Sequence, residues 1–199
     1  MRHVALISTG GTIEKTYDER TGKLENRASI VQRMLARLRL EDVTMNSIQL
    51  LSKDSQHFTD ADRTRILDMT RVMMRPNNNR SDNNRSDNDP SEQAGDIGGD
   101  PDHRAETNGI VILHGTDTLS ITGELLHREI PEPAVPIILT AAMRPFEMKR
   151  SDALQNLTEA IFATGALPPG VYACAHGRAL RFPGVVKDRE RGTFVRGEG

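Results

Sequence analysis

Short apolar runs alternate with amphipathic segments along most of the chain. Between the runs, apolar residues recur at intervals of three and four, which predicts helices around 30–38, 66–73, 119–128 and 153–163. We expect strands at His3–Ser8, Val43–Leu51, Ile110–Leu113, Ile137–Leu139 and Val171–Ala175. Strands that alternate with helices indicate an α/β fold with three layers, in which a parallel sheet with a mixed edge carries helices on both faces.

Two segments break this alternation. Glu14–Arg27 is charged and has no sustained apolar period, so we expect a mobile loop there, followed by a helix with Ser29 as its N-cap. Residues 77–108 repeat Asn-Asn-Arg-Ser-Asp in tandem and carry eight acidic residues against three arginines. Such a polar segment buries too little apolar surface to offset its ordering entropy. We therefore expect a disordered low-complexity insertion in one domain spanning 1–199, with a C-terminal tail over 188–199.

Charge and cysteine content narrow the class of protein. The 199 residues carry a net charge of -2, so nucleic acid is not expected as a partner. The one cysteine, Cys174, lies in an apolar run and is expected to be a buried small residue in a reducing compartment. No signal peptide precedes the first strand, and no apolar run approaches the ~20 residues of a membrane span. These features predict a cytoplasmic protein that does not bind membranes.

The candidate chemistry lies in two glycine-threonine turns, Thr9-Gly10-Gly11-Thr12-Ile13 and His114-Gly115-Thr116-Asp117-Thr118. Each turn follows an expected strand, and parallel strands present their carboxyl ends at one edge of a sheet, where ligands bind. Threonine hydroxyls beside glycine amides suggest acyl transfer, with a nucleophile and an oxyanion hole together. The alternative is that both are structural turns with capping side chains. Neither turn has the pattern of a phosphate-binding loop.

Taken with Asp54-Ser55-Gln56 and Ala142-Met143-Arg144-Pro145, these turns resemble the motifs of the bacterial-type L-asparaginase family. The resemblance extends from the first strand to about Phe194, apart from the insertion. It implies the flavodoxin-like N-terminal domain of that family. It also implies hydrolysis of the side-chain amide of L-asparagine to L-aspartate and ammonia.

The resemblance also implies roles for individual residues. Thr12 matches the nucleophile that forms an acyl-enzyme ester, and Thr116, Asp117 and Lys187 match the catalytic triad. An exposed lysine in the C-terminal tail is the alternative for Lys187. Tyr17 matches the tyrosine of a mobile lid, which could relay the proton of the nucleophile and exclude water. The sequence leaves open which threonine attacks.

Substrate contacts follow from the same motifs. Ser55 and Gln56 resemble the residues that hold the α-carboxylate of the substrate, and Asp117 would pair with its α-ammonium group. Gly115 is expected at the substrate as well. The N–H groups of Gly11 and Thr116 are candidate oxyanion donors. No cofactor and no metal are expected, because the histidines lack metal-ligand spacing. We expect His114 to be a hydrogen-bonded core residue and Arg144 to be structural.

The chain departs from the family pattern at three places. It stops 12 residues after Lys187, so the usual C-terminal domain is not expected, and the resemblance is to a short-chain form. We then expect weaker substrate binding and a homo-oligomer, a dimer or tetramer, that uses another surface, with the tail as a candidate for closing the pocket. Glu14 and Lys15 stand where the family has smaller residues. The insertion is expected away from the site, so deletion of 77–104 should preserve activity.

Two other functions remain open on the sequence. One is a catalytically inactive module that senses asparagine or aspartate. The other is an amidase component of a larger amidotransferase complex. Glutamine is a further candidate substrate, because one added methylene changes selectivity by only ~1–3 kcal/mol.

Overall fold

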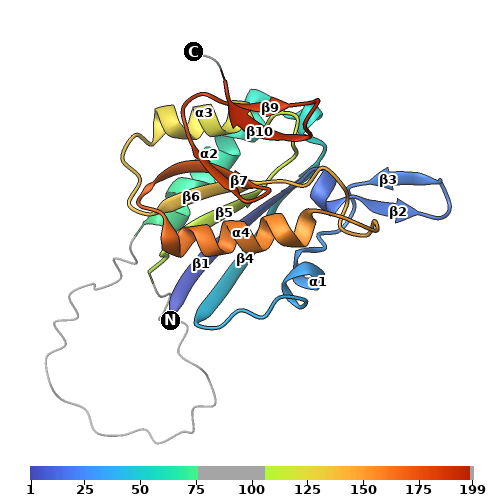
Figure 1. Ribbon diagram of the computed structural model, residues 1–199, viewed down its shortest axis with the longest axis horizontal. Helices are drawn as coiled ribbons and strands as arrows, with labels where there is room; N and C mark the ends of the chain where they lie inside the picture. Colours follow the sequence, from blue (N-terminus) through green and yellow to red (C-terminus); the bar gives the residue numbers. More distant parts are fainter. Residues whose placement is uncertain (76–105, 198–199) are drawn as a thin grey trace, which may run out of the picture.

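A six-stranded sheet with the order β4-β1-β5-β6-β7-β8 forms the centre of the protein (Figure 1). It is seen in a computed structural model that describes residues 1–75 and 106–197. The first five strands are parallel, and β8 pairs antiparallel with β7, which confirms the expected mixed-edge α/β sheet. The strands are β1 (Arg2–Gly10), β4 (Val43–Lys53), β5 (Gly109–Leu113), β6 (Pro136–Thr140), β7 (Gly170–Ala175) and β8 (Arg178–Arg181).

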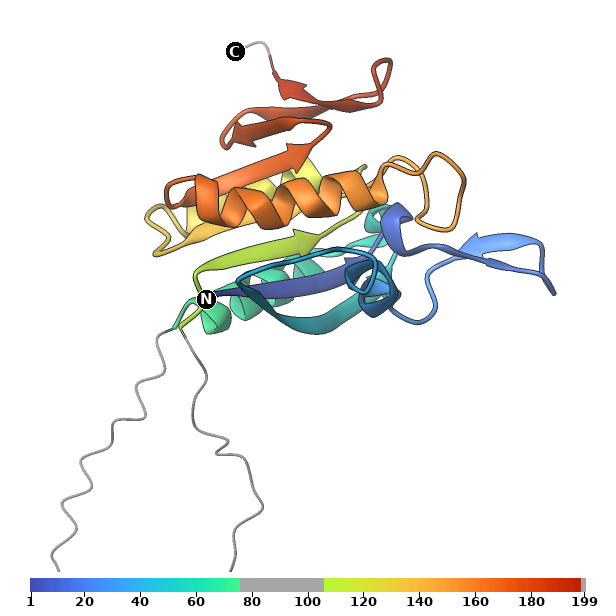
Figure 2. The ribbon, with the colours of Figure 1, turned by 60° about the horizontal axis from the view of Figure 1, so that its bottom comes forward.

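Helices cover both faces of this sheet. Helices α2 (Asp60–Met74) and α3 (Leu119–Glu129) lie on one face, and α1 (Val31–Leu35) and α4 (Ala153–Ala166) lie on the other (Figures 1 and 2). Side chains of a strand alternate between the faces. In β5, Ile110 and Ile112 therefore join the core beneath α2 and α3, whereas Val111 and Leu113 join the core beneath α1 and α4. A strand buried on both faces needs an unbroken apolar run, and this is why β5 is readable from sequence.

Loops that carry polar side chains leave the sheet at the carboxyl ends of its parallel strands. The 3-10 helix η1 (Thr12–Glu14) follows β1, and η2 (Ser55–His57) follows β4. The turn 114–118 follows β5 and leads into α3. Since β1 lies between β4 and β5, these three turns meet at one edge of the sheet.

Several local expectations are corrected by the structure. The loop expected over Glu14–Arg27 contains a hairpin of β2 (Thr16–Asp18) and β3 (Lys23–Glu25), held by cross-strand hydrogen bonds that apolar periodicity does not report. Helix α1 is much shorter than expected, and its N-cap is Ile30. The Ser29 hydroxyl accepts a hydrogen bond from the Val31 N–H but also donates to Glu14.

The C-terminal part contains a second hairpin that the apolar pattern does not predict. Strand β9 (Val185–Asp188) pairs antiparallel with β10 (Thr193–Arg196), and Lys187 stands opposite Phe194. The expected tail over 188–199 therefore contains a strand. Phe194 and Val185 are buried in the core beneath α2 and α3, so the hairpin is packed on the domain.

The expected insertion over 77–108 lies outside the described residues except for its last three. Of these, Asn108 donates its N–H to the His3 carbonyl, and its side chain accepts the His3 N–H. Within the described ranges, no helix has the length and apolar character needed to cross a bilayer.

Candidate active site

Three motifs that are far apart in sequence pack against one another at two glycines. Gly11 has φ 77°, and a Cβ placed on it would lie 2.5 Å from the Gly115 Cα and 2.6 Å from the Gly115 nitrogen. A Cβ on Gly115 would in turn collide with the side chain of Ser55. Only glycine allows these approaches. The turns that carry Thr12 and Thr116 are consequently packed backbone against backbone, and the Ser55 side chain lies directly against Gly115.

A buried carboxylate supports the first turn from behind. Glu14 is buried and accepts hydrogen bonds from the Ser8 hydroxyl, from the Gly10 N–H at 3.1 Å and from the Ser29 hydroxyl at 2.6 Å. Several donors compensate the cost of burying such a group. Glu14 therefore holds the turn that positions Thr12, which is half-buried.

The second turn meets the C-terminal hairpin through Lys187. The Lys187 Nζ donates to the Thr116 Oγ1 at 2.8 Å and to the Asp117 Oδ1 at 2.8 Å. The hydrogen bond from Lys187 is the main cause that lowers the pKa of Asp117 below its ordinary value, so this carboxyl group is ionised. The Lys187 side chain is 17% exposed, which excludes the alternative of an exposed tail lysine.

Aromatic packing fixes the hairpin that carries Lys187. Phe182 lies directly over Gly123 of α3, where any side chain at Gly123 would collide with its ring. Phe194, the partner of Lys187 across the hairpin, is also buried. The Gly184 N–H donates to the Glu124 carboxylate at 2.6 Å. The hairpin is thus joined to α3, which begins directly after the turn that ends in Thr118.

The loop after β4 contributes Ser55 and Gln56 to the same place. The Gln56 Nε2 donates to the Asp117 Oδ2 at 2.7 Å. The Ser55 hydroxyl is buried and has no hydrogen-bond partner among the described residues. Buried hydroxyl groups normally have a hydrogen-bond partner. The Ser55 hydroxyl is therefore available to donate to a bound molecule next to Gly115.

The structure contradicts one of the two expected oxyanion donors, the N–H group of Gly11. The Gly11 N–H already donates to the Lys53 carbonyl at 2.9 Å, because the sheet pairing of β1 with β4 extends into the turn. The Thr116 N–H donates to no acceptor within the described residues and stays available. Gly11 serves the site through its lack of a side chain.

Tyr17 is not gathered into the cluster. Its side chain is 58% exposed, and its hydroxyl lies beside Gly22 at the far end of its own hairpin. That hairpin, β2–β3, projects from the carboxyl edge of the sheet (Figure 2). The Tyr17 N–H donates to the Glu147 carboxylate at 3.0 Å, which ties the hairpin to the loop after β6.

Residues expected to be structural are found in structural positions. His114 is fully buried, and its Nδ1 lies 2.9 Å from the Gly115 carbonyl, which can only accept, so Nδ1 carries the proton. Burial lowers the pKa of His114 to about 4, which keeps it neutral. Cys174 is buried, and burial raises its pKa to about 12. The Arg144 N–H donates to Asp152, within its own loop region.

Three contacts at the site were missed by sequence reasoning. The Thr118 hydroxyl donates to the Ser55 carbonyl at 2.9 Å and joins the second turn to η2. Lys15 donates to the Asp54 carboxylate at 2.6 Å, which links the residues after Thr12 to the residue before Ser55. Arg189 lies 3.3 Å from the Asp117 Oδ1. Long polar side chains next to the motifs were the available signal for the last two.

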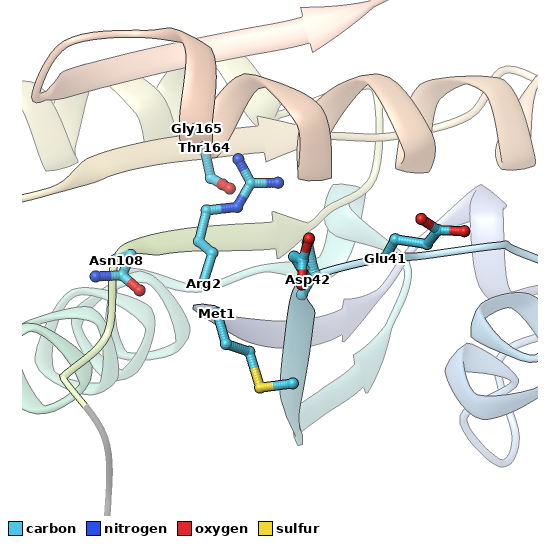
Figure 3. Close-up of a pocket in the computed structure, with 8 residues that line it drawn as sticks. Met1, Arg2, Glu41, Asp42, Asn108, Thr164 and Gly165 are labelled. Carbon is cyan, nitrogen blue, oxygen red and sulfur yellow. The ribbon is translucent and has the colours of Figure 1, made fainter.

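A cavity of about 550 Å³ lies at the opposite, amino end of the sheet (Figure 3). Arg2 reaches across it to Gly165 at the end of α4, and its N–H donates to the Asp42 carbonyl. None of the expected site residues lines this cavity. In the part of the chain that the structure describes, no group of three His, Cys, Asp or Glu side chains could hold a metal ion.

Comparison with known proteins decides the family. The family described as "Asparaginase, N-terminal" matches residues 3–77 and 92–192. This chain belongs to the asparaginase N-terminal domain family. The match covers most of the chain and confirms the resemblance carried by the motifs.

The relatives of this asparaginase N-terminal domain include L-asparaginases and glutamyl-tRNA(Gln) amidotransferase subunits. The L-asparaginase of Thermococcus kodakarensis is 43% identical over 67 residues, which make up 34% of this chain and 20% of that protein. A glutamyl-tRNA(Gln) amidotransferase subunit from Methanobrevibacter smithii is 28% identical over 176 residues, which make up 88% of this chain and 34% of that protein. The chain therefore spans about a third or less of the length of these relatives.

Solved structures agree on the fold of the asparaginase N-terminal domain. The thermostable L-asparaginase from Thermococcus kodakarensis superposes with a TM-score of 0.74 at 24% identity, over 98% of this chain and 51% of that one. L-asparaginase I from Vibrio cholerae gives a TM-score of 0.65 at 23% identity, over 98% and 51%. At these identities the likeness establishes the fold alone.

Proposed function

We propose that this site hydrolyses the side-chain amide of L-asparagine to L-aspartate and ammonia. The observation that carries the proposal is the Lys187 amine, placed 2.8 Å from both the Thr116 hydroxyl and the Asp117 carboxylate. A lysine in this geometry stabilises negative charge on the threonine oxygen or moves its proton, and the carboxylate orients the lysine. A purely structural turn would not need a lysine that contacts both the threonine hydroxyl and the aspartate carboxylate.

In the proposed reaction, the Thr12 hydroxyl oxygen attacks the side-chain amide carbon. The carbon–nitrogen bond breaks, the nitrogen takes a proton and leaves as ammonia, and a β-acyl ester on Thr12 remains. Water then hydrolyses the ester and regenerates the hydroxyl. We assign proton transfer to Thr116, Asp117 and Lys187, and stabilisation of the oxyanion to the free Thr116 N–H. Ser55 and Gln56 hold the carboxyl end of the substrate, and Gly115 lies against it.

Ammonia release from L-asparagine by the wild type, Thr12→Ala and Thr116→Ala tests this assignment. Each variant is expected to lose at least about 10³-fold in kcat/KM, since both hydroxyls are needed in the reaction. Thr64→Ala, an exposed position on α2, is the matched control. Mass spectrometry of the quenched enzyme identifies the acylated threonine. An ester on Thr116 that persists in Thr12→Ala would reverse the two roles.

A second candidate is an ammonia-releasing component of an amidotransferase, favoured by the long match to glutamyl-tRNA(Gln) amidotransferase subunits. This candidate predicts that glutamine exceeds asparagine in kcat/KM for the isolated protein. A third candidate is a sensor of asparagine or aspartate. It predicts calorimetric binding of L-aspartate without ammonia release from either amide.

We also propose that the chain forms a homo-oligomer, as a dimer or tetramer. Large apolar side chains on α3 and α4, Ile121 and Phe162, are exposed and would be covered in an assembly. Gel filtration with light scattering measures the assembly state. A fully active monomer would contradict this part of the proposal.

A further inference from the structure

We infer that His176 is a positioning residue, which anchors the hairpin of Lys187 to the loop that follows β6. The inference rests on the proposed function and adds a residue that lies outside the sequence motifs. His176 stands in the turn between β7 and β8, and its imidazole connects two other elements through hydrogen bonds to Asp152 and Thr193. Neither partner is an expected substrate contact, so His176 acts through Lys187.

The backbone of this turn does not call for a histidine. Ala175 pairs with Arg178 across the hairpin, so His176 and Gly177 are the two central residues of the turn, and their φ angles are 53° and 75°. A two-residue turn with positive φ at both positions prefers Asn-Gly. Asparagine would serve this backbone at least as well as histidine, so the reason for an imidazole lies in its contacts.

The imidazole of His176 bridges two side chains. Its Nε2 lies 2.8 Å from the Asp152 Oδ2, and its Nδ1 lies 2.9 Å from the Thr193 Oγ1. A carboxylate accepts hydrogen bonds, so Nε2 carries the proton, and the bare Nδ1 of the neutral ring accepts from the Thr193 hydroxyl. The His176 N–H donates to the Asn156 side chain of α4 at 3.0 Å. The ring is therefore held in one orientation by its backbone and by both nitrogens.

Asp152 connects the bridge to the turn of the proposed nucleophile. Its carboxylate is 15% exposed and also accepts from the Met143 N–H at 2.9 Å, which fixes the loop after β6. In the same loop, the Phe146 N–H donates to the Ile13 carbonyl at 3.3 Å. Ile13 directly follows Thr12. One end of the bridge is thus joined to the first glycine-threonine turn.

Thr193 connects the bridge to Lys187. It is 8% exposed and stands opposite Asp188, the residue after Lys187, in the β9–β10 hairpin. The aromatic packing of this hairpin lies on its α3 side, and the hydrogen bond to His176 adds an anchor at the turn between β7 and β8. Two anchors fix the strand in position, and with it the 2.8 Å contact of the Lys187 Nζ with Thr116.

Thr193→Val and Thr193→Ser test the bridge by ammonia release from L-asparagine. Valine keeps the shape of threonine without the hydroxyl, so kcat/KM should fall roughly 10- to 100-fold, the loss that follows a displacement of up to ~1 Å at a catalytic group. Serine keeps the hydroxyl and should hold kcat/KM within about twofold of the wild type. Thr158→Val, which removes an exposed hydroxyl from α4, is the matched control and should leave kcat/KM unchanged.

The double variant His176→Asn/Thr193→Val separates positioning from folding. Asparagine suits the positive φ of the turn, and removal of both partners leaves neither one unpaired in the core. The midpoint of urea denaturation should stay near that of the wild type, while kcat/KM falls as far as in Thr193→Val. Wild-type activity in this variant or in Thr193→Val would overturn the inference.

A double-mutant cycle shows whether the bridge acts through Lys187. In the Lys187→Met background, Thr193→Val should change kcat/KM by less than about twofold, because the group that it positions is gone. A purely structural role predicts the same loss in both backgrounds. That result would overturn the inference while the hydrolase assignment stands.

Hydrogen exchange adds a readout without turnover. Residues 185–196 should exchange faster in Thr193→Val than in the wild type, whereas residues 16–25 of the other hairpin should not change. If the wild type releases no ammonia from asparagine or glutamine, the proposed function fails and this measurement decides the anchoring. Faster exchange confined to β9–β10 then supports His176 as the anchor, and unchanged or uniformly faster exchange overturns it.

Discussion

The two short hairpins at the carboxyl edge of the sheet differ in how they are held. The β9–β10 hairpin packs Val185 and Phe194 into the core and delivers Lys187 to Thr116. The β2–β3 hairpin has only two apolar side chains, Tyr17 and Leu24, and projects from the domain (Figure 2). Its Asp18 accepts hydrogen bonds from the Arg20 N–H and the Thr21 hydroxyl within the hairpin and pairs with Arg27 just after it.

This difference fits two different roles in catalysis, rigid positioning of a side chain and movement that admits substrate. A side chain that must stay within hydrogen-bond distance of its partner needs a rigid support, and buried aromatic side chains supply one. A group that must admit substrate and then exclude water needs an element with few buried contacts. The β2–β3 hairpin fits the second description. Four predictions test whether rigidity and mobility are divided between the hairpins in this way.

The largest effect is expected from Lys187→Met compared with Lys23→Met. Loss of the Lys187 amine removes the contact to Thr116 and should lower kcat/KM for the preferred amide about 10³-fold. Lys23 is exposed on β3, and its substitution should leave kcat/KM within about a factor of two. Steady-state assays of ammonia release measure both. Equal losses in the two variants would show that the hairpins do not differ in this respect.

The next effect concerns stability. Phe194→Ala removes a buried aromatic ring from beneath the Lys187 strand and should lower the free energy of unfolding by about 3–5 kcal/mol. Leu24→Ala, at a half-buried position on the other hairpin, should cost less than about 1 kcal/mol. Urea denaturation followed by circular dichroism gives both values. Similar costs would mean that the β2–β3 hairpin is packed as firmly as the β9–β10 hairpin.

Tyr17→Phe tests the mobile hairpin directly. If closure of β2–β3 brings the hydroxyl to the nucleophile, kcat should fall about 10²-fold while the free energy of unfolding stays the same, because the exposed hydroxyl makes no stabilising contact with the described residues. Single-turnover kinetics separate this loss from slow product release. An unchanged kcat would remove Tyr17 from the mechanism.

The smallest expected effect is the pH dependence of stability that comes from His114, which is buried at the carboxyl edge of the sheet. The pKa of His114 is about 4 in the folded protein and 6.5 ordinarily, so between these values the unfolded chain binds a proton that the native state does not. Its stabilising contribution is complete above pH 6.5 and is lost toward pH 4. We expect a loss of about 2 kcal/mol from about pH 7 to about pH 5.

Urea denaturation at the two pH values measures this loss in the wild type and in His114→Gln, which carries no titrating ring. The variant should lack that part of the pH dependence. An identical slope in both proteins would assign the effect to another group. Either hairpin variant, Lys187→Met or Lys23→Met, should retain the wild-type slope.

Much of the fold was predictable because its sheet is buried on both faces. Such strands require continuous apolar runs, and Ile110–Leu113 and Val171–Ala175 supply them at nearly the observed positions. The C-terminal hairpin was not predictable in the same way. Its apolar residues come in pairs between arginines and glycines, so no period of two emerges. Its pairing depends on contacts with α3, which are tertiary.

The candidate site also has parts that local sequence patterns predict and parts that depend on tertiary contacts. Both glycine-threonine turns were readable, because each follows a strand whose end is marked by glycine. Lys187 could be named only through family resemblance, since it lies 71 positions from Thr116 and its local sequence gives no sign of the contact. The Gly11 N–H was wrongly expected to be free, because the sequence does not reveal that β1 continues to pair with β4 at Lys53.

The direct contact of Gly11 with Gly115 has a consequence for how the two halves of the site keep their spacing. Side chains between two elements can change rotamer, and the elements then shift by fractions of an ångström as the core warms or is repacked. Two bare backbones have no such freedom, because atomic radii alone set their distance. The spacing between the backbones that carry the two threonines should therefore resist thermal expansion better than a separation set by packed side chains.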